Sequence, residues 1–343
     1  MPPIVTPDVN AAAEALRSGR LVAMPTETVY GLAAPIASPR SVRAVFELKG
    51  RPLFDPLIVH VAGIDDAKLL VARWPEEAQI LAERFWPGPL SLVIDKADSV
   101  DPLITAGLDT IAVRCPDHAL ARELIALTGP LAAPSANRFG RTSPTTPQHV
   151  LDEFPHADDL LILDGGECEA GIESTVIRID TKTNSLELLR PGPVTPGEIM
   201  AALQSQGIRR DLLDMTSDFR HSANPGARFT DEPALPAPGM LERHYQPSRP
   251  LVIVIAEADT PLERLQQQAA AVIGATDTQT IGELSLGQSP LLAARTLYAN
   301  MRTLAERPDT EAMLVRRSNT QNDEAWNAVW NRLERAASAV VGG

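Results

Sequence analysis

The sequence lacks several features that mark common functional classes. Among its 343 residues there are only two cysteines, Cys115 and Cys168, and they lack CxxC spacing. Two cysteines cannot form a disulfide framework or a four-ligand zinc site. No run reaches the roughly 18 apolar residues of a membrane-spanning helix, and the first twenty residues have no basic-then-apolar signal pattern. We therefore expect a cytoplasmic protein in a reducing compartment.

Basic charge is also scarce. The chain has 31 Lys and Arg against 44 Asp and Glu, a formal charge of −13, and residues 1–210 carry −8 while residues 211–343 carry −5. Only four of the cations are lysines: Lys49, Lys68, Lys96 and Lys182. Proteins that hold nucleic acid through its phosphates need clustered excess cations. Stable nucleic-acid binding is therefore not expected.

The common catalytic signatures are absent from the sequence. There is no GxxxxGK[ST] P-loop, no HExxH, no GxSxG and no kinase motif. The composition, 44% hydrophobic and 22% charged, is that of an ordinary globular protein, and the length allows two domains or one large one. Function must therefore be sought in less familiar clusters of polar residues.

From residue 8 to about residue 184 the sequence has the pattern of a mixed α/β domain, because helix-period stretches alternate with short apolar runs. The clearest helix is predicted over residues 38–48, where Ser38 can cap the N-terminus and Pro39 suits the first turn. Strands are predicted at residues 21–24, 57–61, 90–94, 111–114, 131–133, 160–163, 175–179 and 186–189.

The remaining sequence predicts a linker and a second domain. After a short helix at 196–206, periodicity fades over residues 209–249, a linker or functional loop without elements of its own. From residue 250 the pattern is β-α-β-α-β-α, which predicts a small, parallel-sheet, Rossmann-like domain over 250–343. It has no GxGxxG, so a bound dinucleotide is not expected. The elements are predicted at 251–256, 262–273, 280–284, 291–305, 312–315 and 324–337.

Two polar clusters follow predicted strands or helices near the N-terminus. Residues 25–32, PTETVYGL, place three hydroxyls and a carboxylate together, which suits a polar ligand or, equally simply, a capped turn. In the second cluster Lys49 and Arg51 flank Gly50, and Asp55 and His60 follow. These cations either stabilise a helix C-terminus or form a clamp for phosphate oxygens and a carboxylate. A lone histidine at a strand end is more often structural than catalytic.

A third cluster, residues 134–145, combines hydroxyls, an amide and two arginines around Gly140. Such a loop binds anions without a P-loop, although an ordinary Ser/Asn-rich turn has the same composition. Further polar residues follow at 171–175 and 190–192.

These clusters occur as an ordered set of motifs: PTETVYGL, KGRPLFDPLIVHV, WPGPLSLV, IAVR, PSAN, SPT, GIESTVI and LLRPG. The set resembles the Sua5/YrdC/YciO family, and the whole chain resembles its two-domain Sua5 form. The resemblance implies a YrdC-like catalytic domain with a central cavity over 1–208, a proline-rich linker closing the active site over 209–249, and a Sua5 C-terminal domain over 250–343. It also implies the activity of a nucleotidyltransferase that makes L-threonylcarbamoyladenylate and pyrophosphate from L-threonine, bicarbonate and ATP.

The resemblance assigns roles to individual positions. The KxR and SxN hallmark is Lys49 with Arg51 and Ser135 with Asn137, and the two cations are expected to be catalytic through charge neutralisation. The residues implied to bind L-threonine are Thr28, His60, Arg114, Ala133 and Ser174. Those implied to bind ATP are Lys49, Arg51, Asp55, Thr110, Ser135, Asn137, Ser143, Arg190 and, from the linker motif at 238–247, Tyr245.

The expected cofactor is Mg²⁺ held by the phosphates of ATP, with no protein metal site. The product is expected to pass to the threonylcarbamoyl transferase machinery that forms N6-threonylcarbamoyladenosine at position 37 of tRNAs reading ANN codons. Two alternatives stay open: an RNA-binding regulator, and a carbamoyl-adenylate activity like that of the related domain in hydrogenase-maturation proteins. Both cysteines are interpreted as buried spectators.

Overall fold

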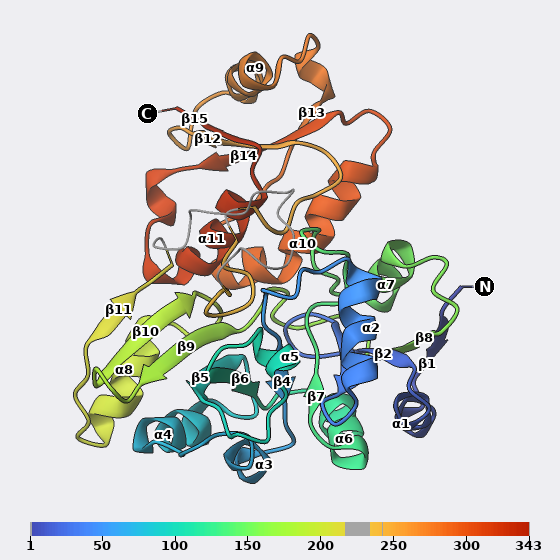
Figure 1. Cartoon of the computed structure of the whole chain (residues 1–343). Helices are drawn as coiled ribbons and strands as arrows, with labels where there is room; N and C mark the ends of the chain where they lie inside the picture. Colours follow the sequence, from blue (N-terminus) through green and yellow to red (C-terminus); the bar gives the residue numbers. More distant parts are fainter. Residues whose placement is uncertain (1, 217–233, 242, 343) are drawn as a thin grey trace. The chain divides into compact units, whose positions relative to one another are not determined.

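The computed structural model describes residues 2–216, 234–241 and 243–342 (Figure 1). The chain divides into two compact units, Met1–Phe139 with Pro144–Glu242, and Gly140–Ser143 with Arg243–Gly343. The described part of the predicted 209–249 linker is thus shared between the units, and residues 217–233 of it lie outside the described residues. Within the described ranges, no helix is both long and apolar enough to cross a membrane.

The first unit is built on one mixed sheet, labelled in Figure 1. In spatial order its described strands are β1 (Ile4–Thr6), β8 (Leu160–Leu163), β2 (Leu21–Met24), β3 (Gly31–Pro35), β7 (Leu131–Ala132), β4 (Ile58–His60), β6 (Thr110–Arg114), β5 (Leu90–Asp95), β9 (Thr175–Asp180), β10 (Ser185–Arg190) and β11 (Leu212–Asp214). The sheet contains both parallel pairs, such as β4·β6, and antiparallel pairs, such as β5·β6, which confirms the predicted mixed α/β class.

One face of this sheet carries the main hydrophobic core of the unit. The helices whose apolar residues enter this core are α2 (Pro39–Lys49), α3 (Ile64–Lys68), α4 (Glu76–Phe85), α5 (Pro102–Thr105), α7 (Pro147–Glu153) and α8 (Pro196–Ser205). Helix α2 begins as predicted, because the Ser38 side chain accepts from the Ser41 amide and Pro39 occupies the first turn. Its C-terminus is set by Gly50, whose φ of 62° is left-handed and therefore favours glycine.

The opposite face is covered in two different ways. Over strands β8, β2, β3 and β7 it packs against α1 (Val9–Arg17) and α6 (Ala119–Thr128), which contact each other. Over β4, β6, β5, β9 and β10 its apolar side chains pack instead against two fully buried residues of the linker, Ala237 and Met240. The half of the sheet without a helix on this face is therefore covered by a short irregular segment, residues 235–241.

The second unit contains a four-stranded sheet in the order β13-β14-β12-β15, and every pairing in it is parallel. The predicted parallel sheet is thereby confirmed. Its described elements are β12 (Leu251–Ile255), α9 (Leu262–Ile273), β13 (Ile281–Glu283), α10 (Pro290–Glu306), β14 (Ala312–Arg317), α11 (Asn327–Ala336) and β15 (Ala339–Val341), with 3₁₀ turns at Thr278–Thr280, Asn319–Gln321 and Glu324–Trp326.

Four described strands were not predicted from the sequence: β1, β3, β11 and β15. Strand β3 has the sequence GLAAP, whose small residues and terminal proline give no strand signal. The neighbouring segment lies close to this strand, because a Cβ on Gly31 would be 3.1 Å from the Cβ of Ala133. Strand β11 lies in the stretch predicted to have no elements, which was wrong, because β10 supplies a parallel partner for it. Strand β15 follows α11 and pairs with β12.

Candidate active site

The candidate site lies on the sheet face that is covered by residues 235–241. In the β4·β6 register Ile58 pairs with Ala112 and His60 with Arg114, so these four side chains share a face, since alternate residues of a strand do. Ile58 and Ala112 belong to the cluster that Met240 covers. The chain therefore places two polar side chains, His60 and Arg114, at the carboxyl ends of adjacent parallel strands beside an apolar, covered floor.

Arg114 is held by three neighbours. Its Nε donates to the carbonyl oxygen of Gly88 at 3.2 Å, and its Nη1 donates to the Thr28 hydroxyl at 2.9 Å. Its Nη2 lies 2.7 Å from a carboxylate oxygen of Glu27, and both side chains are buried. The Thr28 hydroxyl also contacts that of Thr26 at 2.9 Å. An arginine fixed in this way offers its remaining N–H groups to a ligand carboxylate.

His60 is buried with 3% of its surface exposed, and its pKa is lowered to about 3, first by burial and then by the charge of Arg114. The imidazole is therefore neutral at every pH at which the protein is expected to work. A neutral ring beside Arg114 can donate and accept one hydrogen bond each, as a substrate hydroxyl requires.

The buried neutral histidine predicts a pH dependence of stability. The unfolded chain binds a proton on His60 below its ordinary pKa of 6.5, whereas the folded state does not until about pH 3. Stability should therefore fall as pH decreases below about 6.5, by about 1.4 kcal/mol per unit from this residue. Urea unfolding between pH 7.5 and 5 should give a shallower slope for His60→Gln than for the unchanged chain, and equal slopes would contradict this prediction.

Lys49 and Arg51 lie on either side of Gly50 at the C-terminus of α2, and both are buried. The Lys49 ammonium donates to the carbonyl oxygens of Ser135 and Asn137, the second at 2.5 Å. The Arg51 guanidinium lies 2.8 Å from Asp55 and donates to the Pro56 carbonyl at 2.7 Å. The predicted hallmark residues are thus brought together, although the contacts of Lys49 are to main-chain oxygens.

Burial alters the titration of this cluster. The pKa of Lys49 is lowered well below its usual value, first by burial and then by the charge of Arg51. Burial raises the pKa of Asp55, while Arg51 opposes that change. An anion placed next to the two cations would favour their charged forms. The cluster therefore gains most from a ligand of high negative charge, such as a phosphate chain.

Ser174 and Arg190 form the third part of the site. Arg190 Nε donates to the Ser174 carbonyl at 3.0 Å, and its Nη2 donates to the Ser174 hydroxyl at 3.1 Å. The same hydroxyl contacts that of Ser91 at 2.8 Å. Arg190 Nη1 donates to the carbonyl of Pro238 at 3.2 Å. Residues 235–241 are thereby hydrogen-bonded to a predicted ATP-binding residue.

Gly192 follows Arg190 and leaves no space for a side chain. A Cβ on it would lie 2.6 Å from the Ser174 carbonyl carbon and closer still to the Thr175 amide. We expect Gly192→Ala to lower stability by about 1–3 kcal/mol, because backbone must move, and to weaken L-threonine binding by displacing Ser174. Gly63→Ala is the matched control, since its Cβ meets nothing within 4 Å. Equal unfolding midpoints for the two variants in urea would contradict the prediction.

The other predicted residues lie in both units. Ala133 donates its amide to the Ile58 carbonyl at 3.1 Å, and Thr110 begins β6 on the face of Arg114. Ser143 and Tyr245 belong to the second unit, where Thr142 donates to the Tyr245 carbonyl at 3.3 Å. The Tyr245 ring is buried there, stacked on Tyr298 with centroids 5.8 Å apart and with the Arg332 guanidinium 5.5 Å from its centroid. Their role towards ATP stays a prediction.

Three contributors were not assigned from sequence: Glu27, Ser91 and the carbonyl of Pro238. Glu27 lies inside the first polar motif, so its position carried a signal, but its ion pair joins residues 87 positions apart. Ser91 is a small polar residue within the predicted strand LSLVI, a weaker signal. A main-chain carbonyl has no sequence signal at all.

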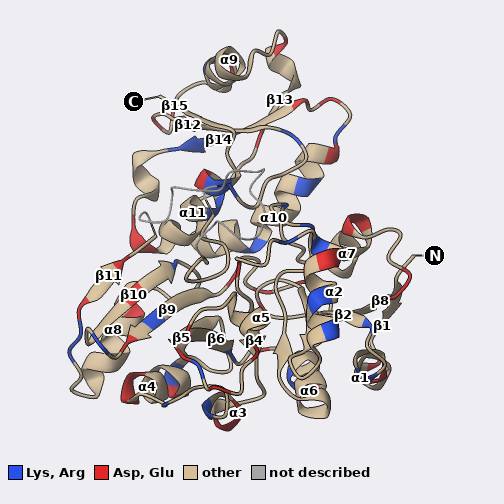
Figure 2. Cartoon of the chain, viewed as in Figure 1, with Lys and Arg blue, Asp and Glu red and all other residues tan. Residues whose placement is uncertain are grey.

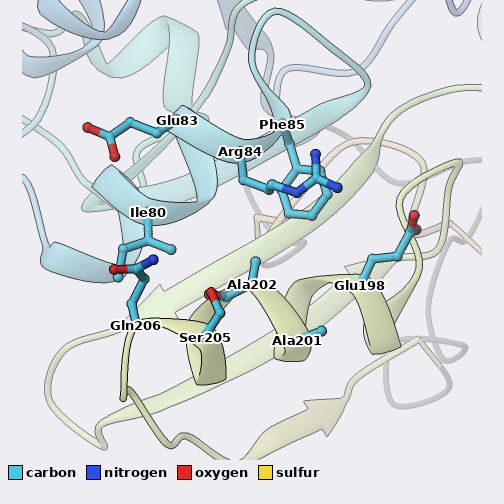
Figure 3. A pocket seen from close by; sticks show the side chains of 9 residues that line it. All are labelled: Ile80, Glu83, Arg84, Phe85, Glu198, Ala201, Ala202, Ser205 and Gln206. Carbon is cyan, nitrogen blue, oxygen red and sulfur yellow. The ribbon is translucent and has the colours of Figure 1, made fainter.

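Figure 2 shows acidic residues on α3 and α4, among them those in the first turn of each helix. A groove of about 520 Å³ lies between α4 and α8 (Figure 3), and its polar lining residues are distinct from those of the site. In the described ranges, no three His, Cys, Asp or Glu side chains are grouped as metal ligands.

Known proteins are similar to this chain in sequence and in fold. Residues 14–192 match the Sua5/YciO/YrdC family, described as "Telomere recombination", and residues 194–338 match "Threonylcarbamoyl-AMP synthase, C-terminal domain". Two similar proteins are named threonylcarbamoyl-AMP synthase. The protein of Pyrococcus abyssi is 37% identical over 96% of this chain and 94% of its own length. The protein of Bacillus subtilis is 38% identical over 80% of this chain and 75% of its own length. The crystal structure of P. abyssi Sua5 complexed with L-threonine matches 99% of both chains with a TM-score of 0.83 and 34% identity. The chain therefore belongs to the Sua5/YciO/YrdC family.

Proposed function

We propose that the protein is an L-threonylcarbamoyladenylate synthase, an enzyme that joins L-threonine, bicarbonate and ATP and releases pyrophosphate. The observation that carries this proposal is the division of the buried cations into two groups. Arg114, beside Thr28 and His60, suits a small amino acid. Lys49 and Arg51 suit a polyanion. The names of the relatives and the threonine complex of the P. abyssi protein support the same reaction.

On the amino-acid side, Arg114 binds the threonine carboxylate while His60 and Thr28 bind polar atoms of the substrate. The threonine amine attacks the carbon of bicarbonate, and one water leaves as the carbamate forms. No covalent enzyme intermediate is needed, so orientation contributes most of the rate enhancement. The neutral His60 suits this task, because it can donate or accept a hydrogen bond without placing a second positive charge, which would repel it, beside the substrate ammonium group.

On the nucleotide side, a carbamate oxygen attacks the α-phosphorus of ATP and pyrophosphate leaves. Lys49, Arg51 and Arg190 stabilise the negative charge that develops on the phosphate chain and on the leaving group. We propose that ATP enters as its Mg²⁺ complex, with the ion held by phosphate oxygens, the hard ligands it prefers. Asp55, the acidic side chain paired with Arg51, is already occupied by that arginine.

The product is a reactive mixed anhydride, which we propose is passed directly to a threonylcarbamoyl transferase for tRNA modification in the cytoplasm. The net charge of −13 supports transfer of a small molecule over stable binding of the tRNA itself. A salt-dependent RNA gel shift by the intact protein would instead favour the RNA-binding alternative.

The decisive experiment is to incubate the purified full chain with ATP and bicarbonate and with threonine, serine or carbamoyl phosphate in turn. We expect the threonylcarbamoyl adenylate, identified by its mass, together with pyrophosphate, in the threonine reaction. Adenylate from carbamoyl phosphate alone would support the carbamoyl-adenylate alternative and overturn the proposal.

A further inference from the structure

A buried carboxylate lies next to the proposed threonine-binding arginine without a complete set of partners. Glu27 has 7% of its surface exposed, and Oε2 lies 2.7 Å from Arg114 Nη2. Its other oxygen, Oε1, is buried and has no hydrogen-bond partner among the described residues. A carboxylate removed from water normally uses both oxygens, because an unsatisfied buried acceptor is costly. Glu27 Oε1 is therefore available to a donor that is not part of the chain.

The charges of Arg114 and Glu27 are complementary to those of an amino acid. Arg114 offers donors to a carboxylate, and Glu27 offers an acceptor beside it. A zwitterionic α-amino acid carries an ammonium group separated from its carboxylate by one carbon atom. If the carboxylate binds Arg114, the ammonium group is brought to the adjacent Glu27. This inference rests on the function proposed above.

We propose that Glu27 binds the ammonium group of the amino-acid substrate and removes the proton that this group must lose. One N–H bond of the ammonium breaks and one O–H bond forms on Oε1, which leaves a neutral amine and a neutral carboxylic acid. The amine lone pair then forms the C–N bond with bicarbonate. Because a low-dielectric site disfavours charged groups, this transfer neutralises two charges that are costly to keep buried.

The other ionisable groups around Glu27 keep a constant charge in the working pH range. Burial raises the pKa of Cys115 to about 11, and burial also raises that of Cys168, so both thiols stay protonated. His60, which faces Arg114, stays neutral because its pKa is about 3. A pH dependence that disappears with Glu27 can therefore be assigned to the proton transfer.

The test compares Glu27→Gln, Glu27→Asp and the unchanged full chain in adenylate formation from about pH 7 to about pH 9.5. At pH 7 we expect Glu27→Gln to lower kcat/KM for threonine by about 100-fold or more, the usual contribution of an acid–base group. The deficit should shrink by up to about tenfold per pH unit, because the bulk solution then supplies neutral amine. Glu27→Asp should recover part of the lost rate. A deficit that is constant with pH would overturn the proton transfer.

Two further measurements separate this inference from other causes. Glu77→Gln is the matched control, because Glu77 is also a buried acid paired with an arginine, with its oxygen 2.8 Å from Arg210 Nε. It should keep full activity. Calorimetric titration with L-threonine should give at least about tenfold weaker binding for Glu27→Gln. If the unchanged chain binds threonine but makes no adenylate, the proposed function is wrong while the binding role of Glu27 is still tested by the titration. If Glu27→Gln binds threonine as tightly as the unchanged chain, the role of Glu27 is overturned.

Discussion

Replacing Arg51 by alanine is expected to lower adenylate formation by about 100-fold to 1,000-fold, the usual loss when one preorganised donor to a developing charge is removed. The guanidinium is held 2.8 Å from Asp55 and by the Pro56 carbonyl. It is therefore already oriented before any phosphate arrives. Lys49→Ala should have a comparable effect, because its ammonium also fixes the carbonyls of Ser135 and Asn137. Pyrophosphate release in the presence of threonine and bicarbonate measures both.

The control for these variants is Lys68→Ala. Lys68 is a lysine of α3 with 41% of its side chain exposed, and its nearest acid, Asp65, is 3.8 Å away. Loss of such a surface pair changes stability by less than about 1 kcal/mol and should leave turnover intact. If Arg51→Ala or Lys49→Ala folds normally and turns over like Lys68→Ala, the assignment of the phosphate side is wrong.

The part of the site near Lys49 could be predicted because its determinants are local. Ser38, Pro39 and Gly50 mark both ends of α2, and the positions of Lys49 and Arg51 follow directly from where that helix stops. The parallel sheet of the second unit was predictable for a similar reason, since its strands and helices alternate along the sequence. In both cases, residues close in sequence decide the structure.

The other half of the site could not be predicted from local patterns. Arg114 donates a hydrogen bond to Thr28, which is 86 positions away in the sequence, and Lys49 donates one to the carbonyl of Ser135 at the same sequence separation. Only the order of strands β3, β7, β4 and β6 in the sheet brings these segments together. Motif resemblance could name Arg114 and Thr28 as site residues, but it could not identify Glu27 as the counter-charge that holds the arginine. That role depends on side-chain geometry alone.

Removing the guanidinium at position 114 is expected to have the second large effect. Arg114→Met takes away the proposed carboxylate donor, and it leaves Glu27 as a buried carboxylate without its ion-pair partner. Breaking a buried ion pair on one side costs about 3–5 kcal/mol. We therefore expect a variant that is markedly less stable in urea and that loses threonine-dependent pyrophosphate release by about 100-fold or more. By itself this result cannot separate a loss of stability from a loss of chemistry.

The double variant Arg114→Met with Glu27→Leu separates the two effects. Side chains of similar volume replace both charges, and such replacement of a buried ion pair is often neutral or stabilising. Stability should therefore return to within about 1 kcal/mol of the unchanged chain, so the effects of the two substitutions on the free energy of unfolding should be strongly non-additive in the mutant cycle. Activity should stay lost, because neither the carboxylate donor nor the proton acceptor is present. Recovery of threonine-dependent turnover in the double variant would mean that the pair serves folding only, and the threonine site would then have to lie elsewhere on this face of the sheet.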